Sequence, residues 1–148
     1  MSPTEQSAPG LTLAAIWHDE CLLELEALVE YSGFRGRSTA YTEPQVIAEF
    51  ADALMAFDAK REGGPTFEAG FSDGSKALHM RVYECDRAGH LAMHMHMTTD
   101  APGGHRPEEI WRLDIELKTE AQSLVCFARE LRELARTQSG EAFLWAAP

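Results

Sequence analysis

The sequence predicts a single α+β domain in which an antiparallel sheet of about seven strands carries two helices on one face, in the order βββ-α-ββββ-α. Two kinds of periodicity predict this fold. In most of the chain apolar and polar residues alternate, which is typical of strands with one side in water. In two segments apolar residues recur three and four positions apart, which is typical of helices that cover a sheet. Clusters of Gly, Asp, Ser and Pro predict the turns between them.

Three strands are expected before the first helix. Residues 11–16 alternate weakly, whereas residues 21–31 alternate strongly, with apolar side chains on one parity. The other parity of this segment carries the acids Glu20, Glu24, Glu26 and Glu30. Leu and Glu are also good helix formers, so a helix is the alternative, but a strand leaves all four acids in water. Ser32 and Gly33 predict a turn, and residues 34–41 a returning strand.

The first helix is expected from Thr42 onwards. A hydroxyl at Thr42 can cap the first turn, Glu43 suits the positive end of the helix dipole, and Pro44 is tolerated near a helix start. The apolar stripe consists of Val46, Ile47, Phe50, Ala51, Leu54 and Phe57. Two glycines and a proline at 63–65 predict its end.

Four more strands are expected at about 66–71, 78–83, 91–98 and 111–117. The hairpin between the second and third of them can close in two registers. An even loop sets Val82 opposite Met93, whereas an odd loop sets methionines opposite His79 and Arg81, so burial favours the even register. Met80, Met93, Met95 and Met97 are then expected in the core rather than on an adaptable binding surface.

The second helix is predicted to start with a capping box, in which Thr119 is the cap and Gln122 lies three residues later. It should run to about residue 138 and bury Leu124, Phe127, Leu131 and Leu134. Residues 139–148 are then expected to form a C-terminal tail, and the polar residues 1–10 a disordered N-terminal segment, which leaves residues 11–138 as the domain.

The tail carries three large apolar residues. Phe143, Leu144 and Trp145 would form an exposed apolar patch if they stood free. The prediction is that they are buried, either within a monomer or across a homodimer.

Composition narrows the class of partner. The 148 residues include 13 Lys and Arg against 24 Asp and Glu, a net charge of −11, which opposes binding to nucleic acid or to an anionic membrane. Three cysteines without a CxxC pair predict free thiols, and the polar N-terminus resembles neither a signal peptide nor an anchor. A cytoplasmic protein is therefore expected. The charge predicts either simple solubility or a basic protein partner.

Five short motifs, spread over roughly residues 11–136, together resemble the WapI-type immunity proteins, a family of small bacterial α+β proteins. They are Leu-Leu-Glu-Leu-Glu at 22–26, Gly-Phe-Arg-Gly at 33–36, Glu-Pro at 43–44, an Asp-x-x-Gly-His turn at 86–90 and Ser-Leu-x-x-Phe at 123–127. The resemblance implies a protein that binds and neutralises a cognate toxin domain, often a nuclease. It implies no shared set of functional residues.

The expected interface consists of acids, because complementary charge speeds the encounter with a basic partner and adds affinity. The candidate residues are Glu20, Glu24, Glu26, Glu30, Glu43, Glu49 and Asp52. Glu24 and Glu26 would stand about 6.6 Å apart on a strand, a workable acid–base spacing, but a solvated acidic face is the preferred interpretation. No nucleophile elbow or phosphate loop occurs, so a non-enzymatic protein without a cofactor is expected.

Histidines supply the alternative function. His94 and His96 form an HxH pair on a predicted strand, the pattern by which jelly-roll enzymes hold a metal ion, and His79 and His90 are expected on the same wet face. A metal-binding protein or metal-dependent enzyme built on His94 and His96 is therefore the alternative. The preferred prediction is no metal, because the even register places the fixed positive charge of Arg81 opposite His94.

Overall fold

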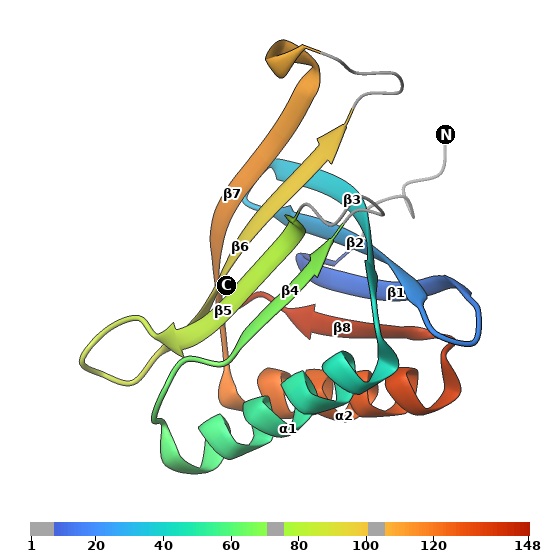
Figure 1. Cartoon of the computed structure of the whole chain (residues 1–148). Helices are drawn as coiled ribbons and strands as arrows, with labels where there is room; N and C mark the ends of the chain where they lie inside the picture. The colour runs from blue at the N-terminus through green and yellow to red at the C-terminus, as the bar shows by residue number, and fades with distance from the viewer. Residues whose placement is uncertain (1–7, 71–75, 101–105) are drawn as a thin grey trace.

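The computed structural model describes residues 8–70, 76–100 and 106–148, and it confirms an α+β fold with an antiparallel sheet and two helices (Figure 1). The sheet has eight strands in the order β7-β6-β5-β4-β3-β2-β1-β8. The strands are β1 (Gly10–His18), β2 (Leu23–Tyr31), β3 (Phe34–Thr42), β4 (Thr66–Gly70), β5 (Lys76–Glu84), β6 (Leu91–Asp100), β7 (Ile110–Thr119) and β8 (Glu141–Trp145). The helices are α1 (Pro44–Lys60) and α2 (Ala121–Thr137), and a short 3₁₀ helix, Pro107–Glu109, precedes β7.

The eighth strand lies in the segment expected to be a tail. It pairs with β1, and its inward residues Ala142 and Leu144 are buried. The predicted burial of the three large tail residues is therefore met only in part: Leu144 is buried and Phe143 half-buried, but Trp145 points outward. At the other end, β1 begins at Gly10, inside the predicted disordered segment, of which residues 1–7 lie outside the described chain.

The two helices pack against each other and cover one side of the sheet, as Figure 1 shows. Their predicted stripes are buried, among them Phe50 of α1 and Phe127 of α2, except that Val46 is only partly buried. The predicted caps are wrong by one residue. Glu43 and Glu120 occupy the cap positions without a side-chain hydrogen bond, because β3 and β7 extend to include Thr42 and Thr119.

The predicted register of the β5–β6 hairpin is confirmed. Val82 pairs with Met93, and the neighbouring pairs place Met80 and Leu78 opposite the other two strand methionines. All of these side chains are buried. The methionines are therefore core residues, and Arg81 lies opposite His94 as expected.

The sheet bends sharply between β3 and β4. Among the described residues these two strands share one pair, Tyr41 with Gly70, and β3 contacts β5 and β6 as well. A Cβ atom added to Gly36 of β3 would lie 2.6 Å from Leu113 Cδ2 of β7, so only glycine permits this approach without displacing the leucine side chain. The bend divides the sheet into two halves, β8-β1-β2-β3 and β4-β5-β6-β7. Strand β3 of the first half faces β6 and β7 of the second. Neither described helix is long and apolar enough to cross a membrane.

Candidate functional site

The outer side of β2, which the helices do not cover, carries three of the predicted partner-binding acids. Because Leu25, Ala27 and their neighbours of the same parity are buried, Glu24, Glu26 and Glu30 point outward. The pairing of the strands adds a fourth acid. Glu26 pairs with Ala14 of β1, which pairs in turn with Glu141 of β8. Sequence reasoning missed Glu141, because its position depends on the pairing of β8 with β1.

An aromatic pair stands on the same side. A bulge in β1 at Ile16 brings Trp17 opposite Glu24, and Glu24 pairs with Tyr41 on its other flank. The Trp17 and Tyr41 rings meet edge to face, with centroids 6.2 Å apart, although a whole strand separates their backbones. Trp17 nevertheless remains 47% exposed. The acid at Glu24 therefore lies between two aromatic side chains.

A second aromatic pair comes from β8. Phe143 and Trp145 are in edge-to-face contact with centroids 4.7 Å apart, and Trp145 is 53% exposed. Gly10 makes room for them, since a Cβ atom there would lie 2.9 Å from Phe143 Cζ. We call this surface of β8, β1, β2 and β3 the outer face. Its functional side chains are Trp17, Glu24, Glu26, Glu30, Tyr41, Glu141, Phe143 and Trp145.

Arginines border the outer face on β3. Arg35 pairs with Glu30, and Arg37 pairs with Leu28. Opposite charges on paired strands stabilise a sheet, so Glu30 is partly balanced by Arg35. The acids without an arginine opposite them in the sheet are Glu24, Glu26 and Glu141. The negative charge that no arginine balances therefore lies on β2 and β8, away from the arginines of β3.

The turn between β1 and β2 extends the acidic surface at one end. Glu20 is exposed there, next to Asp19, whose Oδ1 accepts hydrogen bonds from the backbone N–H groups of Leu22 at 2.7 Å and Cys21 at 2.8 Å. These bonds lower the pKa of the Asp19 carboxyl, which favours its charged form. Glu43 follows Thr42, the strand partner of Leu23, and so lies at the same end of the strands as this turn.

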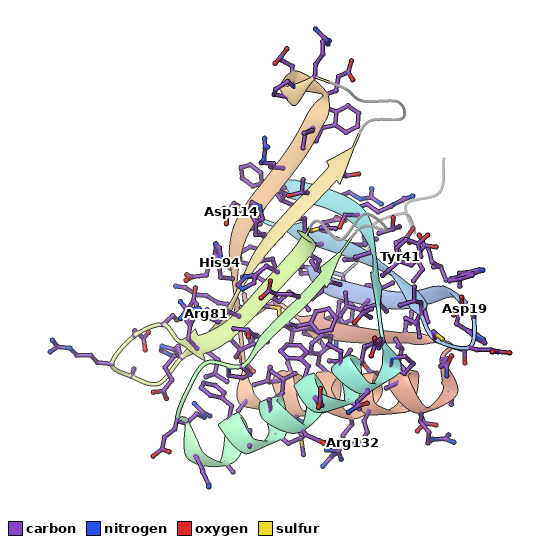
Figure 2. The ribbon with its side chains drawn as sticks, in the orientation of Figure 1. Asp19, Tyr41, Arg81, His94, Asp114 and Arg132 are labelled. Carbon is purple, nitrogen blue, oxygen red and sulfur yellow. The ribbon has the colours of Figure 1, made fainter. Side chains whose placement is uncertain are left out.

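The structure separates the remaining two candidates from this surface. Glu49 and Asp52 lie on α1, in the helix layer on the opposite side of the sheet. Asp52 forms an ion pair with Arg132 of α2 at 2.7 Å, and Figure 2 shows Arg132 at this layer, below Tyr41 of the sheet. The seven predicted acids therefore do not form one interface.

The histidines lie on the outer side of the other half of the sheet. His94 Nε2 contacts Asp114 Oδ1, and His96 Nδ1 lies 3.3 Å from Asp114 Oδ2, so one carboxylate of β7 bridges both rings. Figure 2 labels His94 and Asp114 of this cluster. Burial acts to raise the pKa of Asp114, but the hydrogen bond from His96 and the charges of both histidines outweigh it and lower that pKa. In the described parts of the chain, no three His, Cys, Asp or Glu side chains are arranged to hold a metal ion.

The other two histidines differ in their surroundings. His79 pairs with His96 across the β5–β6 ladder. His90 Nδ1 lies 2.6 Å from Asp86 Oδ2, within the turn that joins these strands. This contact and the N–H of His90 lower the pKa of Asp86. His90 thus belongs to a turn and not to the strand face that carries His94.

A further polar contact on this side involves a residue that sequence reasoning did not single out. The Tyr83 hydroxyl donates a hydrogen bond to Glu116, and the Arg81 guanidinium lies 4.6 Å from the centre of the Tyr83 ring. Burial and the hydrogen bond to Glu116 raise the pKa of Tyr83 to about 12. These contacts link β5 to β7 across the intervening strand.

No protein-family model, curated protein or solved structure matches this chain.

Proposed function

We propose that this chain is a non-enzymatic binding protein whose outer face binds a basic protein. The observation that supports it is the presence of two exposed tryptophans, Trp17 and Trp145, on the same sheet face as Glu24, Glu26 and Glu141. Tryptophan and tyrosine are the residues that most often carry the binding energy of a protein interface. Acids around them attract a partner of opposite charge.

The size of the outer face suits such a partner. Three strands of nine residues and β8 of five, spaced about 4.8 Å apart, give an area of roughly 500 Å². A protein interface of standard size buries about 800 Å² on each partner, so the outer face supplies the larger part of such an interface and its flanking turn adds to it. The net charge of −11 adds long-range attraction, which accelerates association at low salt.

The resemblance to WapI-type immunity proteins makes a toxin domain the proposed partner. A nuclease toxin has a cationic groove for its substrate, and an acidic protein can occupy that groove. The proposed setting is the cytoplasm, where the three free cysteines stay reduced. The competing explanation, an acidic surface that serves solubility alone, assigns no role to the exposed tryptophans.

The test begins with capture of partners from a native lysate at low salt and identification of a basic protein. Its association with the purified chain is then measured at increasing salt. We expect Glu24→Lys with Glu26→Lys to slow association strongly. The matched control, Glu49→Lys with Glu62→Lys, makes the same change in net charge away from the outer face and should slow it less.

The aromatic contribution has its own test. Trp17→Ala with Trp145→Ala should weaken the complex at least about tenfold, mainly through faster dissociation. Trp111→Ala is the control, since Trp111 is 60% exposed but lies on β7 in the other half of the sheet. If the identified partner binds all four variants as tightly and as fast as the unmodified chain, the outer face is not the interface.

A further inference from the structure

One edge of the sheet is open. Strand β7 has a single strand neighbour, β6, along its whole length. In the described chain, its other edge is bonded only at its end, where the Lys118 carbonyl and the Thr119 hydroxyl contact the C-terminal segment. Residues 110–117 therefore carry unpaired backbone groups along this edge, which forms a margin of the sheet in Figure 1.

The opposite edge of the sheet is protected. Strand β8 has only five residues, and α2 packs beside it. The backbone N–H of Phe143 donates a 2.8 Å hydrogen bond to the Glu130 carboxylate of α2. Short strands, covered edges, prolines and bulges are the means by which proteins avoid edge-to-edge pairing. Strand β7 is ten residues long and has neither a proline nor a bulge in its pairing with β6.

The inner side of the open edge is apolar and incompletely covered. The parity of β7 turns Trp111, Leu113 and Ile115 inward, yet Trp111 is 60% exposed and the other two are only partly buried. A cavity of about 180 Å³, which Ser38 of β3 also lines, lies beside Trp111 and Leu113. A further strand that pairs with β7 covers part of this apolar surface with its own side chains.

Symmetry limits how a second copy of β7 can pair with this edge. Two copies related by a two-fold axis run antiparallel, and the axis sets the inner side of one beside the inner side of the other. A residue, and not the midpoint between two residues, therefore stands on the axis, since a slip by one residue exchanges the two sides. With Leu113 on the axis, residues 110–116 pair with their equivalents, all within the open part of the edge.

The side chains of β7 complement one another in this register. Arg112 lies opposite Asp114 of the second copy, and symmetry makes this pair occur twice. Within its own sheet Arg112 lies opposite Thr98, so β6 offers it no acid. Trp111 lies opposite Ile115 of the second copy, and pairs of an aromatic and a β-branched residue stabilise adjacent strands. An axis at Asp114 sets two carboxylates against each other instead.

We propose that the open edge of β7 pairs with the same edge of a second copy, antiparallel about Leu113, so that the chain forms a homodimer with one sheet continuous across both copies. The pairing uses no residue of the outer face. It is therefore independent of the proposed protein partner.

Sedimentation equilibrium of the full chain, from micromolar to millimolar concentration, measures the association. The mass should rise from the 16.4 kDa of one chain toward twice that value. Arg112→Glu sets a carboxylate opposite Asp114 at two positions and should weaken the dimer at least about tenfold. The matched control, Arg129→Glu, makes the same change in charge at an exposed position of α2 and should leave the dimer unchanged.

A mixing experiment tests the register. Asp114→Lys sets two cations opposite each other and should also weaken the dimer. Arg112→Glu mixed with Asp114→Lys should associate more tightly than either variant alone, because every facing pair of residues 112 and 114 then joins opposite charges. Circular dichroism verifies that each variant is folded.

Amide hydrogen exchange of the unmodified chain supplies a readout that needs no substitution. Amides of residues 110–116 that face the open edge should exchange more slowly at high protein concentration than at low. Three results would overturn the proposal: a monomer at millimolar concentration, exchange at residues 110–116 that is independent of concentration, or a dimer that Arg112→Glu and Arg129→Glu weaken equally.

Discussion

The Thr119 hydroxyl donates a 2.7 Å hydrogen bond to the backbone carbonyl of Trp145, which joins β7 to β8, the two edge strands of the sheet. A second bond, from the Ala147 N–H to the Lys118 carbonyl at 2.7 Å, lies beside it. The first and last strands of the sheet order thus meet at one end. Such contacts occupy edge groups that could otherwise pair with another chain.

Thr119→Val should destabilise the protein by about 0.5–1.5 kcal/mol, because it removes the hydrogen bond between the buried Thr119 side chain and the carbonyl of the half-exposed Trp145. Thr119→Ser keeps the hydroxyl and serves as the control, with a smaller loss. Urea unfolding of the three proteins measures the difference. Equal midpoints for Thr119→Val and Thr119→Ser would show that the hydrogen bond contributes nothing.

Ser38→Ala should stabilise the protein by about 1 kcal/mol, since it removes a buried hydroxyl that has no partner among the described residues. For a domain of this size, that corresponds to a rise of a few degrees in melting temperature. Calorimetric melting measures it. A marked loss of stability would mean that the hydroxyl has a partner in solution.

Tyr83 should ionise near pH 12, since burial and its hydrogen bond to Glu116 raise the pKa of Tyr83 to about 12. A raised folded-state pKa means that its contribution to stability is complete below pH 10, the ordinary value, and is lost as the pH rises through about 12. Glu116→Gln removes the negative charge and should lower the pKa of Tyr83. Difference absorbance of tyrosinate, compared with Tyr83→Phe, identifies the transition.

Asp114 should contribute to acid sensitivity. The pKa of Asp114 is lowered in the folded protein, because the bond from His96 and the charges of His94 and His96 outweigh the effect of burial. Its contribution to stability is therefore present above the ordinary carboxyl range near pH 4 and is lost as the pH falls below it. Asp114→Asn should unfold with a flatter dependence on pH in this range. Urea midpoints between pH 5 and pH 2.5 provide the measurement.

Zinc should not bind to the histidine strand with micromolar affinity. His94 and His96 already share Asp114, and the positive charge of Arg81 lies opposite His94. Calorimetric titration with zinc measures this, with His94→Ala plus His96→Ala as the control for binding elsewhere. Micromolar binding that disappears in this double variant would instead support the metal-binding alternative.

The periodicity of the sequence was sufficient to predict most elements and one register. Alternation over residues 21–31 predicted β2 and its outward acids, because the parity of a strand determines which side chains are buried. The parity of one loop placed Val82 opposite Met93. Strand β8 was not predicted. It has only five residues, which is too short for an alternation of apolar and polar residues to distinguish a strand from an irregular tail.

Capping by Thr42 and Thr119 was predicted from local spacing alone and is wrong for a non-local reason. Both hydroxyls belong to strand ends that continue further than expected, by one residue in β3 and by two in β7. Thr119 is then close enough to Trp145, which is 26 residues away in sequence, to bond to it. A cap preference is worth about 1 kcal/mol, which tertiary contacts readily override.

The sequence by itself determined which side of each strand is buried, where the helices run and that the surface is acidic, because these properties depend on neighbouring residues. Tertiary structure alone decided which strands that are distant in sequence are neighbours. Pairing of β8 with β1 brought Glu141 and Trp145 to the acids of β2, and the helix layer removed Glu49 from them. The bend at β3 and β4 created the cavity at Ser38. A period of two is the same for every strand, so it carries no information about strand order or sheet curvature.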